Sequence, residues 1–188
     1  MPLQPRILFS VALLLIANMT LSADEKKDSQ ELAVAAIKKM GGRVQADSKT
    51  PGQPVVKVYL FGGKIAGTGL DCLKALPAVY WVGLHDSDTT NADVKHLKCL
   101  PKLRRLSLAE TKITDAALID LKEITTLEWL ELHHCAITDV GLVHLKSLKK
   151  LKHLDLHGTK VTKEGIKELQ DAIPNVKIYH PLKPLEKE

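Results

Sequence analysis

The chain has 188 residues, which is enough for one domain with a substantial apolar core. It carries 27 Lys and Arg against 22 Asp and Glu, for a formal net charge of +5, and these charges are mixed along the chain. A nucleic-acid-binding protein is expected to cluster its cations. The charge distribution therefore argues against nucleic acid as a partner.

Residues 1–23 have the pattern of a secretory signal peptide. Arg6 precedes an apolar run, Ile7–Ala17, that is too short to span a bilayer comfortably. The small residue Ala23 is followed by the charged segment Asp24–Lys27, as at a cleavage site. We therefore expect an exported protein that is periplasmic, held in the cell envelope or secreted. The alternative is that the segment is retained as an anchor, which is the one membrane association that we expect.

Residues 24–54 are expected to form an N-terminal capping helix and a loop. The charged segment Asp24–Ser29 is expected to be mobile, and Ser29 is expected to begin the helix. Gly41 and Gly42 end it, and Arg43–Pro54 reads as a polar loop. The helix has apolar residues at the spacing of one buried stripe, namely Leu32, Ala33, Ala36, Ile37 and Met40.

From Val55 to about residue 180 the sequence repeats every 24 residues. The segment LxxLxLxx(T/C)x(I/V)T begins at Leu103, Leu127 and Leu151. A fixed period of this length is typical of a solenoid, in which neighbouring coils share one core. Counting back by 24 gives three columns without a polar residue: Val55, Val79, Leu103, Leu127 and Leu151; Val58, Val82, Leu106, Leu130 and Leu154; and Leu60, Leu84, Leu108, Leu132 and Leu156.

The remainder of each repeat is expected to be a short helix, capped at its start by a Thr-Asp pair such as Thr138-Asp139. Residues 87–94 depart from this pattern and suggest a distorted or specialised second coil. Residues 176–179 are expected to form a sixth, closing strand. Its register is open, because Ile178 fits a strict count of 24 whereas Val176 and Tyr179 fit a one-residue insertion. Residues 181–188 are expected to be a flexible tail.

These motifs resemble the leucine-rich repeat family. The Thr-Asp-x-Gly-Leu segment and Cys135 resemble its cysteine-containing subtype, and the ends of the repeat region resemble small exported proteins of planctomycete-type bacteria. The resemblance implies an α/β fold: a right-handed solenoid with a concave parallel sheet of about six strands, convex helices and an N-terminal helical cap. The subtype is known from ubiquitin-ligase substrate adaptors, and the signal peptide disfavours that role here.

The predicted concave face carries the candidate binding residues. Successive side chains of a strand alternate between its two faces, so the residues between the core columns point outward. Both tryptophans of the chain fall in one outward column, and exposed tryptophan is a common interface anchor. The alternative is that they only pack over Arg105 and His153. The candidates for binding a protein or peptide are Trp81, Arg105, Trp129, Glu131, His133, His153, Asp155 and His157.

Two other functions remain open from the sequence. Glu131, His133, Asp155 and His157 have side chains that bind Zn²⁺, which suggests a metal-binding surface with possible hydrolytic activity, although a flat sheet disfavours tetrahedral closure. A structural scaffold of the envelope is the other alternative. Cys135 is expected to be buried rather than nucleophilic, and no general base is aimed at Ser107. We therefore predict a non-enzymatic protein without catalytic residues, resident metal or cofactor.

Overall fold

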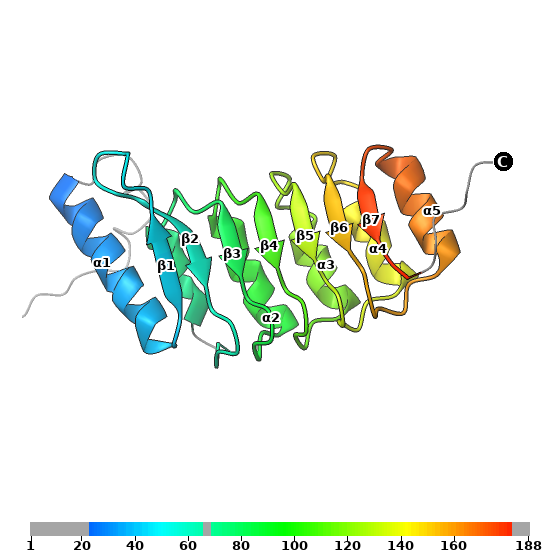
Figure 1. Cartoon of the computed structure of the whole chain (residues 1–188), viewed down its shortest axis with the longest axis horizontal. Helices are drawn as coiled ribbons and strands as arrows, with labels where there is room; N and C mark the ends of the chain where they lie inside the picture. Colours follow the sequence, from blue (N-terminus) through cyan, green and yellow to red (C-terminus); the bar gives the residue numbers. More distant parts are fainter. Residues whose placement is uncertain (1–22, 66–68, 182–188) are drawn as a thin grey trace, which may run out of the picture.

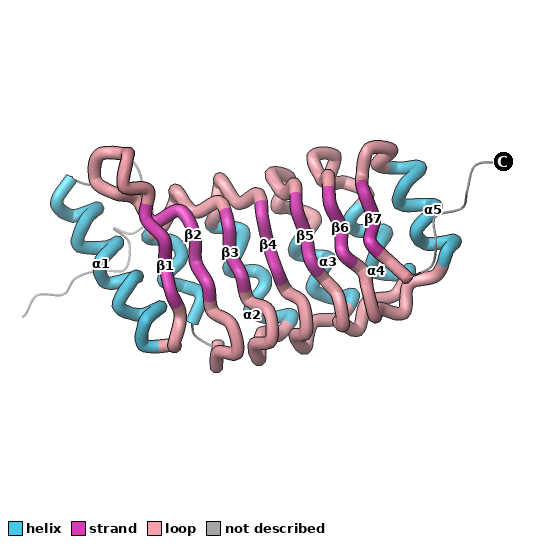
Figure 2. The backbone as a smooth tube through the Cα atoms, in the orientation of Figure 1, coloured by secondary structure: helices cyan, strands magenta, loops and turns pink. Residues whose placement is uncertain are grey.

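The computed structural model describes residues 23–65 and 69–181 and consists of one seven-stranded sheet with helices along one of its faces (Figures 1 and 2). The strands lie in chain order, and β2 to β7 are parallel. Apart from Ala23 and Pro181, the predicted signal peptide and tail lie outside the described residues. The strands are β1 (Arg43–Ala46), β2 (Val55–Tyr59), β3 (Trp81–Gly83), β4 (Arg105–Ser107), β5 (Trp129–Glu131), β6 (His153–Asp155) and β7 (Lys177–Tyr179).

The N-terminal helix precedes the sheet, and from β2 to β6 each strand is followed by a helical segment on the same face of the sheet. No helix in the described ranges is long and apolar enough to cross a membrane. The α-helices are α1 (Ala23–Lys39), α2 (Asn91–Val94), α3 (Asp115–Leu121), α4 (Asp139–Leu145) and α5 (Lys163–Ala172), and the 3₁₀ helices are η2 (Gly69–Ala75) and η3 (Lys95–Cys99). The expected α/β leucine-rich repeat solenoid is confirmed.

The strand register follows the 24-residue period throughout the parallel part. Leu106 pairs with Leu130, and Leu130 pairs with Leu154. The closing strand keeps the same count, since Leu154 pairs with Ile178. The strict register is therefore correct, and no residue is inserted before β7. The three apolar columns are buried and form one continuous core with the inward leucines of the helices.

Helix α1 begins earlier than the sequence predicted. It starts at Ala23 rather than at Ser29, whose hydroxyl instead donates a hydrogen bond to the carbonyl of Lys26 inside the helix. Asp24 and Glu25 in the first turn favour this start, because acidic side chains interact well with the positive end of the helix dipole. Ala33 and Ile37 are buried as predicted, whereas Leu32 is 73% exposed.

The predicted loop before the repeats contains a strand. β1 pairs antiparallel with β2, joining Arg43 to Tyr59 and Val44 to Val58. An edge strand leaves backbone donors and acceptors without partners, and β1 supplies those partners to β2. The prediction of a loop over residues 43–54 was therefore wrong for its first four residues. The sheet has one antiparallel strand beyond the six parallel strands that the repeats predicted.

The Thr-Asp segments join neighbouring coils as well as capping helices. Thr138 accepts a hydrogen bond from Val140 N at the start of α4, as predicted. Asp115 does not cap its own helix: it accepts from Thr138 N at 2.8 Å and from Thr138 Oγ1 at 2.6 Å in the next coil. A β-carbon on Gly141 would lie 2.3 Å from Asp115 Oδ1, so the glycine of the motif makes room for this carboxylate.

The irregular second coil preserves the same links with different residues. Asn91 replaces the aspartate, donating to Thr114 Oγ1 at 2.9 Å and accepting from Thr114 N at 2.8 Å. Asp93 caps the backbone N–H of Thr90 at 2.8 Å. Strand β3 stays in register with both of its neighbours. The second coil is therefore locally rebuilt while the sheet continues through it.

Candidate binding face

The sheet face away from the helices, which we call the open face, carries the eight candidate residues. The pairing of strands places Trp81, Arg105, Trp129 and His153 side by side in one row. Glu131 and Asp155 are paired in the next row, two residues further along their strands. Arg105 and His157 are exposed, and the other six are partly exposed.

Cationic and aromatic side chains alternate along this row. Lys57 Nζ lies 4.9 Å from the centre of the Trp81 ring. The Arg105 guanidinium lies between the two tryptophans, 5.7 Å from Trp81 and 5.2 Å from Trp129. His153 stacks on Trp129 at 4.3 Å between ring centres. We call this row, Lys57–Trp81–Arg105–Trp129–His153, the cation–aromatic ladder.

The ladder is ordered by contacts within the protein. Each cation–π contact at an exposed site contributes about 0.5–1 kcal/mol. Trp129 Nε1 also donates to Glu131 Oε1 at 2.8 Å, and Tyr59 packs edge-on against Trp81 at 5.3 Å. The expected packing of the tryptophans over Arg105 and His153 is present, and it leaves both tryptophans partly exposed and Arg105 exposed.

The histidines and carboxylates of the open face form pairs rather than a metal site. His133 Nδ1 lies 3.2 Å from Asp155 Oδ2, and His133 Nε2 lies 3.9 Å from Glu110 Oε1. Asp155 Oδ1 accepts from the backbone N–H of His157 at 2.9 Å, and Glu131 is bonded to Trp129. In residues 23–65 and 69–181, no three His, Cys, Asp or Glu side chains are placed to hold a metal ion.

Ser107 and Cys135 are not available for chemistry on the open face. Ser107 pairs with Glu131 on the neighbouring strand and is only 5% exposed. Cys135 is buried as predicted, and its Sγ donates to the Leu108 carbonyl at 3.1 Å. Burial raises the pKa of the Cys135 thiol, so little of the reactive thiolate is present near neutral pH.

The sequence did not predict a groove along the edge at which the parallel strands begin. It has a volume of about 950 Å³. Its lining includes Asp47, Thr50 and Pro54, which come from the loop between β1 and β2 at this edge of the sheet (Figure 1). We call it the basic groove, because its lining includes the cations Lys57, Lys102, Arg104, Arg105 and Lys150 against the acids Asp47 and Glu128.

Both acids of the basic groove already have partners. Lys152 Nζ donates to Glu128 Oε2 at 2.7 Å, and Arg104 Nε lies 3.7 Å from Glu128 Oε1. The hydrogen bond from Lys152 lowers the pKa of Glu128. Asp47 accepts from Thr50 Oγ1 at 2.7 Å, which lowers the pKa of Asp47. The positive charge of the remaining cations is therefore only partly compensated.

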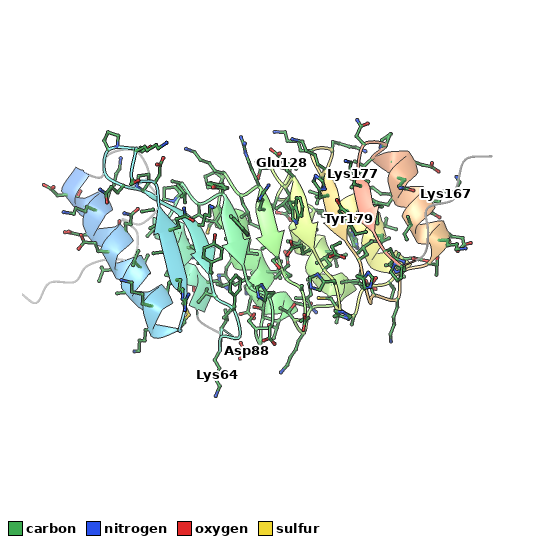
Figure 3. The ribbon with its side chains drawn as sticks, in the orientation of Figure 1. Lys64, Asp88, Glu128, Lys167, Lys177 and Tyr179 are labelled. Atoms are coloured by element: carbon green, nitrogen blue, oxygen red, sulfur yellow. The ribbon has the colours of Figure 1, made fainter. Side chains whose placement is uncertain are left out.

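The side chains at the two ends of the parallel strands differ in charge: we call the end at which the strands begin the starting edge, and the other end the opposite edge. Glu128 and Lys177 lie at the starting edge, and Lys64 and Asp88 lie at the opposite edge (Figure 3). A shallow hollow at that opposite edge is lined by Asp86, Asp88 and Glu110 together with Lys64, Lys112 and His134. The basic groove is thus confined to the starting edge.

Similarity to known proteins agrees with this architecture. Residues 123–146 and 147–169 match a family model described as "Leucine Rich repeat". No curated protein sequence matches the chain. The chain is similar to the solved leucine-rich repeat ectodomain of the receptor kinase SOBIR1 from Arabidopsis thaliana, with 14% identity and a TM-score of 0.50 over 81% of this chain and 91% of that one.

Two further structures show the range of the similarity. The PEPR1–AtPEP1 structure has 16% identity and a TM-score of 0.50, over 81% of this chain and 24% of that one. Internalin C2 from Listeria monocytogenes has 17% identity and a TM-score of 0.47 over 82% of this chain and 88% of that one. Likeness at such low identity shows a shared fold and leaves the function to be inferred from the site.

Proposed function

We propose that the chain, which has the leucine-rich repeat fold, is a non-enzymatic module that binds a protein or peptide through its open face. The cation–aromatic ladder is the observation that carries this proposal. It concentrates both tryptophans of the chain and an arginine, the residue types that dominate binding energy at interfaces. No structural role in the core requires them, because the core is complete behind the sheet.

The rigidity of the ladder favours binding. Parallel pairing fixes the backbone beneath each side chain, and contacts on both ring faces of Trp129 hold its ring. Side chains that are ordered before binding lose little entropy in the complex, and each such side chain otherwise costs about 0.5–1.5 kcal/mol. The ladder therefore supports a peptide-binding function better than a loose row of surface residues.

The proposal is tested by selecting random displayed peptides on the intact protein. Peptides enriched on the native chain are then titrated against the Trp81→Ala/Trp129→Ala double variant. We expect a loss of affinity of at least about 30-fold, the effect of removing a hot-spot residue. The matched control is Ile119→Ala/Val140→Ala, which removes two exposed apolar side chains from α3 and α4. That control is expected to leave the affinity unchanged.

Two outcomes would reject the open face as the binding surface. In the first, the enriched peptides bind the double variant as tightly as the native chain. In the second, the α3/α4 control loses the affinity instead. Circular dichroism and urea unfolding of each variant show whether the sheet is preserved, so that a loss of affinity is assigned to the face rather than to unfolding.

A further inference from the structure

We infer that the basic groove binds a peptide segment in a polyproline-type conformation that carries acidic side chains three positions apart. This inference rests on the proposed function, since it assigns a ligand chemistry to one part of the same binding surface. Four observations carry it: the spacing of the groove's cations, their available charge, the apolar lining between them, and the hydrogen-bonded loop that lines the groove.

The spacing of the groove's cations predicts the spacing of the acidic side chains in the peptide ligand. Lys57 and Arg105 stand two strands apart in one row, and Lys102 and Lys150 are separated by two repeats of 24 residues. Because neighbouring strands are about 4.8 Å apart, each pair spans about 10 Å. A polyproline helix has three residues per turn and rises about 3.1 Å per residue, so side chains three positions apart share one face about 9 Å apart.

The same four cations have charge to offer a ligand. Within the described part of the chain, Lys57, Lys102, Arg105 and Lys150 form no ion pair within 4.0 Å, in contrast to Arg104, which faces Glu128. The charge of Lys150 also contributes to the lowered pKa of Glu128, after the larger effect of Lys152. Lys57 and Arg105 are instead held against the rings of the ladder. A guanidinium that is already ordered presents its edge to a carboxylate at a lower entropic cost.

The lining between the cations favours a peptide over a uniformly charged polymer. Val56, Ala78, Tyr80 and Pro101 line the groove between the charged positions, and aromatic-lined grooves accept proline-rich segments. Glu128 and Asp47 interrupt the run of positive charge. A sulfated glycan or a nucleic acid would place an anion opposite each of them, whereas a peptide can place neutral residues there.

Hydrogen bonds within the chain hold the loop between β1 and β2, which lines the groove. Asp47 N donates to the Pro54 carbonyl at 2.9 Å and closes the loop. Gln30 of α1 anchors it, donating to the Gln53 carbonyl at 3.3 Å and accepting from Val55 N at 3.0 Å. The N-terminal helix therefore supports the loop that lines the groove as well as covering the core.

The test uses the intact chain and three synthetic peptides of equal length. Pro-Glu-Pro-Pro-Glu-Pro has the inferred spacing, Pro-Glu-Glu-Pro-Pro-Pro has adjacent acids, and Pro-Gln-Pro-Pro-Gln-Pro has none. Isothermal titration is expected to show the first peptide binding at least about 5-fold more tightly than the other two, from two exposed ion pairs. Raising the salt concentration is expected to reduce this difference.

The role of the groove's cations in binding the spaced acids is tested first by substituting Lys102 and Lys150, which lie outside the ladder. Lys102→Gln/Lys150→Gln leaves the second matched pair, Lys57 and Arg105, in place, so it is expected to weaken binding of the first peptide. The further change Arg105→Gln breaks that pair as well and is expected to lower the affinity to that of the native chain for the glutamine peptide. The matched control is Lys64→Gln/Lys112→Gln at the opposite edge of the sheet, and it is expected to keep the preference for spaced acids.

Three results would overturn the inference. The three peptides bind equally; the variant carrying Lys102→Gln, Lys150→Gln and Arg105→Gln keeps the preference; or a sulfated oligosaccharide binds the native chain more tightly than the spaced peptide. The proposed function is separable from this test. Displayed peptides that require Trp81 and Trp129 but lack acids and ignore the lysine variant would reject the groove's ligand and retain the binding face.

Discussion

Truncation of Leu130 to alanine is expected to lower the free energy of unfolding by about 2–5 kcal/mol, the usual cost of such a cavity in a packed core. Leu130 is fully buried in β5 and pairs in register with Leu106 and Leu154 on the neighbouring strands. Each coil of a solenoid is stabilised by its two neighbours. A cavity at this position therefore weakens the contacts of three consecutive coils.

Urea unfolding followed by circular dichroism measures this effect. Val140→Ala is the matched control, because Val140 is 71% exposed on α4, and surface changes of this kind usually shift stability by no more than about 0.5 kcal/mol. A loss below about 1 kcal/mol for Leu130→Ala would contradict the continuous leucine core.

Replacement of Gly141 by alanine is expected to destabilise the protein by about 1–3 kcal/mol, the usual cost of overpacking. Within an ordinary helix the same change is favourable by about 1 kcal/mol, so the expected sign is reversed. The added β-carbon would lie 2.3 Å from Asp115 Oδ1 and 2.9 Å from Leu118 Cδ1. It would displace the carboxylate that holds Thr138 in the next coil.

A double-mutant cycle with Asp115→Ala identifies the cause. Once the carboxylate is removed, the remaining close contact of the methyl group is with Leu118 Cδ1 at 2.9 Å, so Gly141→Ala is expected to destabilise the protein less than it does in the native background. Thermal and urea unfolding of the four proteins give the coupling energy. If Gly141→Ala stabilises the native background, the glycine is not making room for Asp115.

The fold could be predicted because the repeat constrains every coil in the same way. Leu106, Leu130 and Leu154 occupy one column at a spacing of 24 residues, and only a register of 24 buries all three together. The same register places Trp81, Arg105 and Trp129 in one row. The composition of the candidate face therefore followed from the sequence once the period was known.

The ends of the solenoid could not be predicted in the same way, because the repeat says nothing about them. Strand β1 satisfies the open edge of β2, a requirement of the assembled sheet that leaves only a weak signal in the four residues RVQA. The basic groove was missed for a related reason. Its cations come from different positions of the repeat, and Asp47 and Thr50 close it from outside the repeats.

The intrinsic fluorescence of the intact chain tests binding at the open face most directly. Trp81 and Trp129 are the only tryptophans in the sequence, and both lie in the cation–aromatic ladder. A peptide selected on the native protein is expected to change their emission saturably, with the same dissociation constant as isothermal titration. A peptide that binds with measurable heat but leaves the emission unchanged at saturation would show that it binds elsewhere, and the open face would not be its binding site.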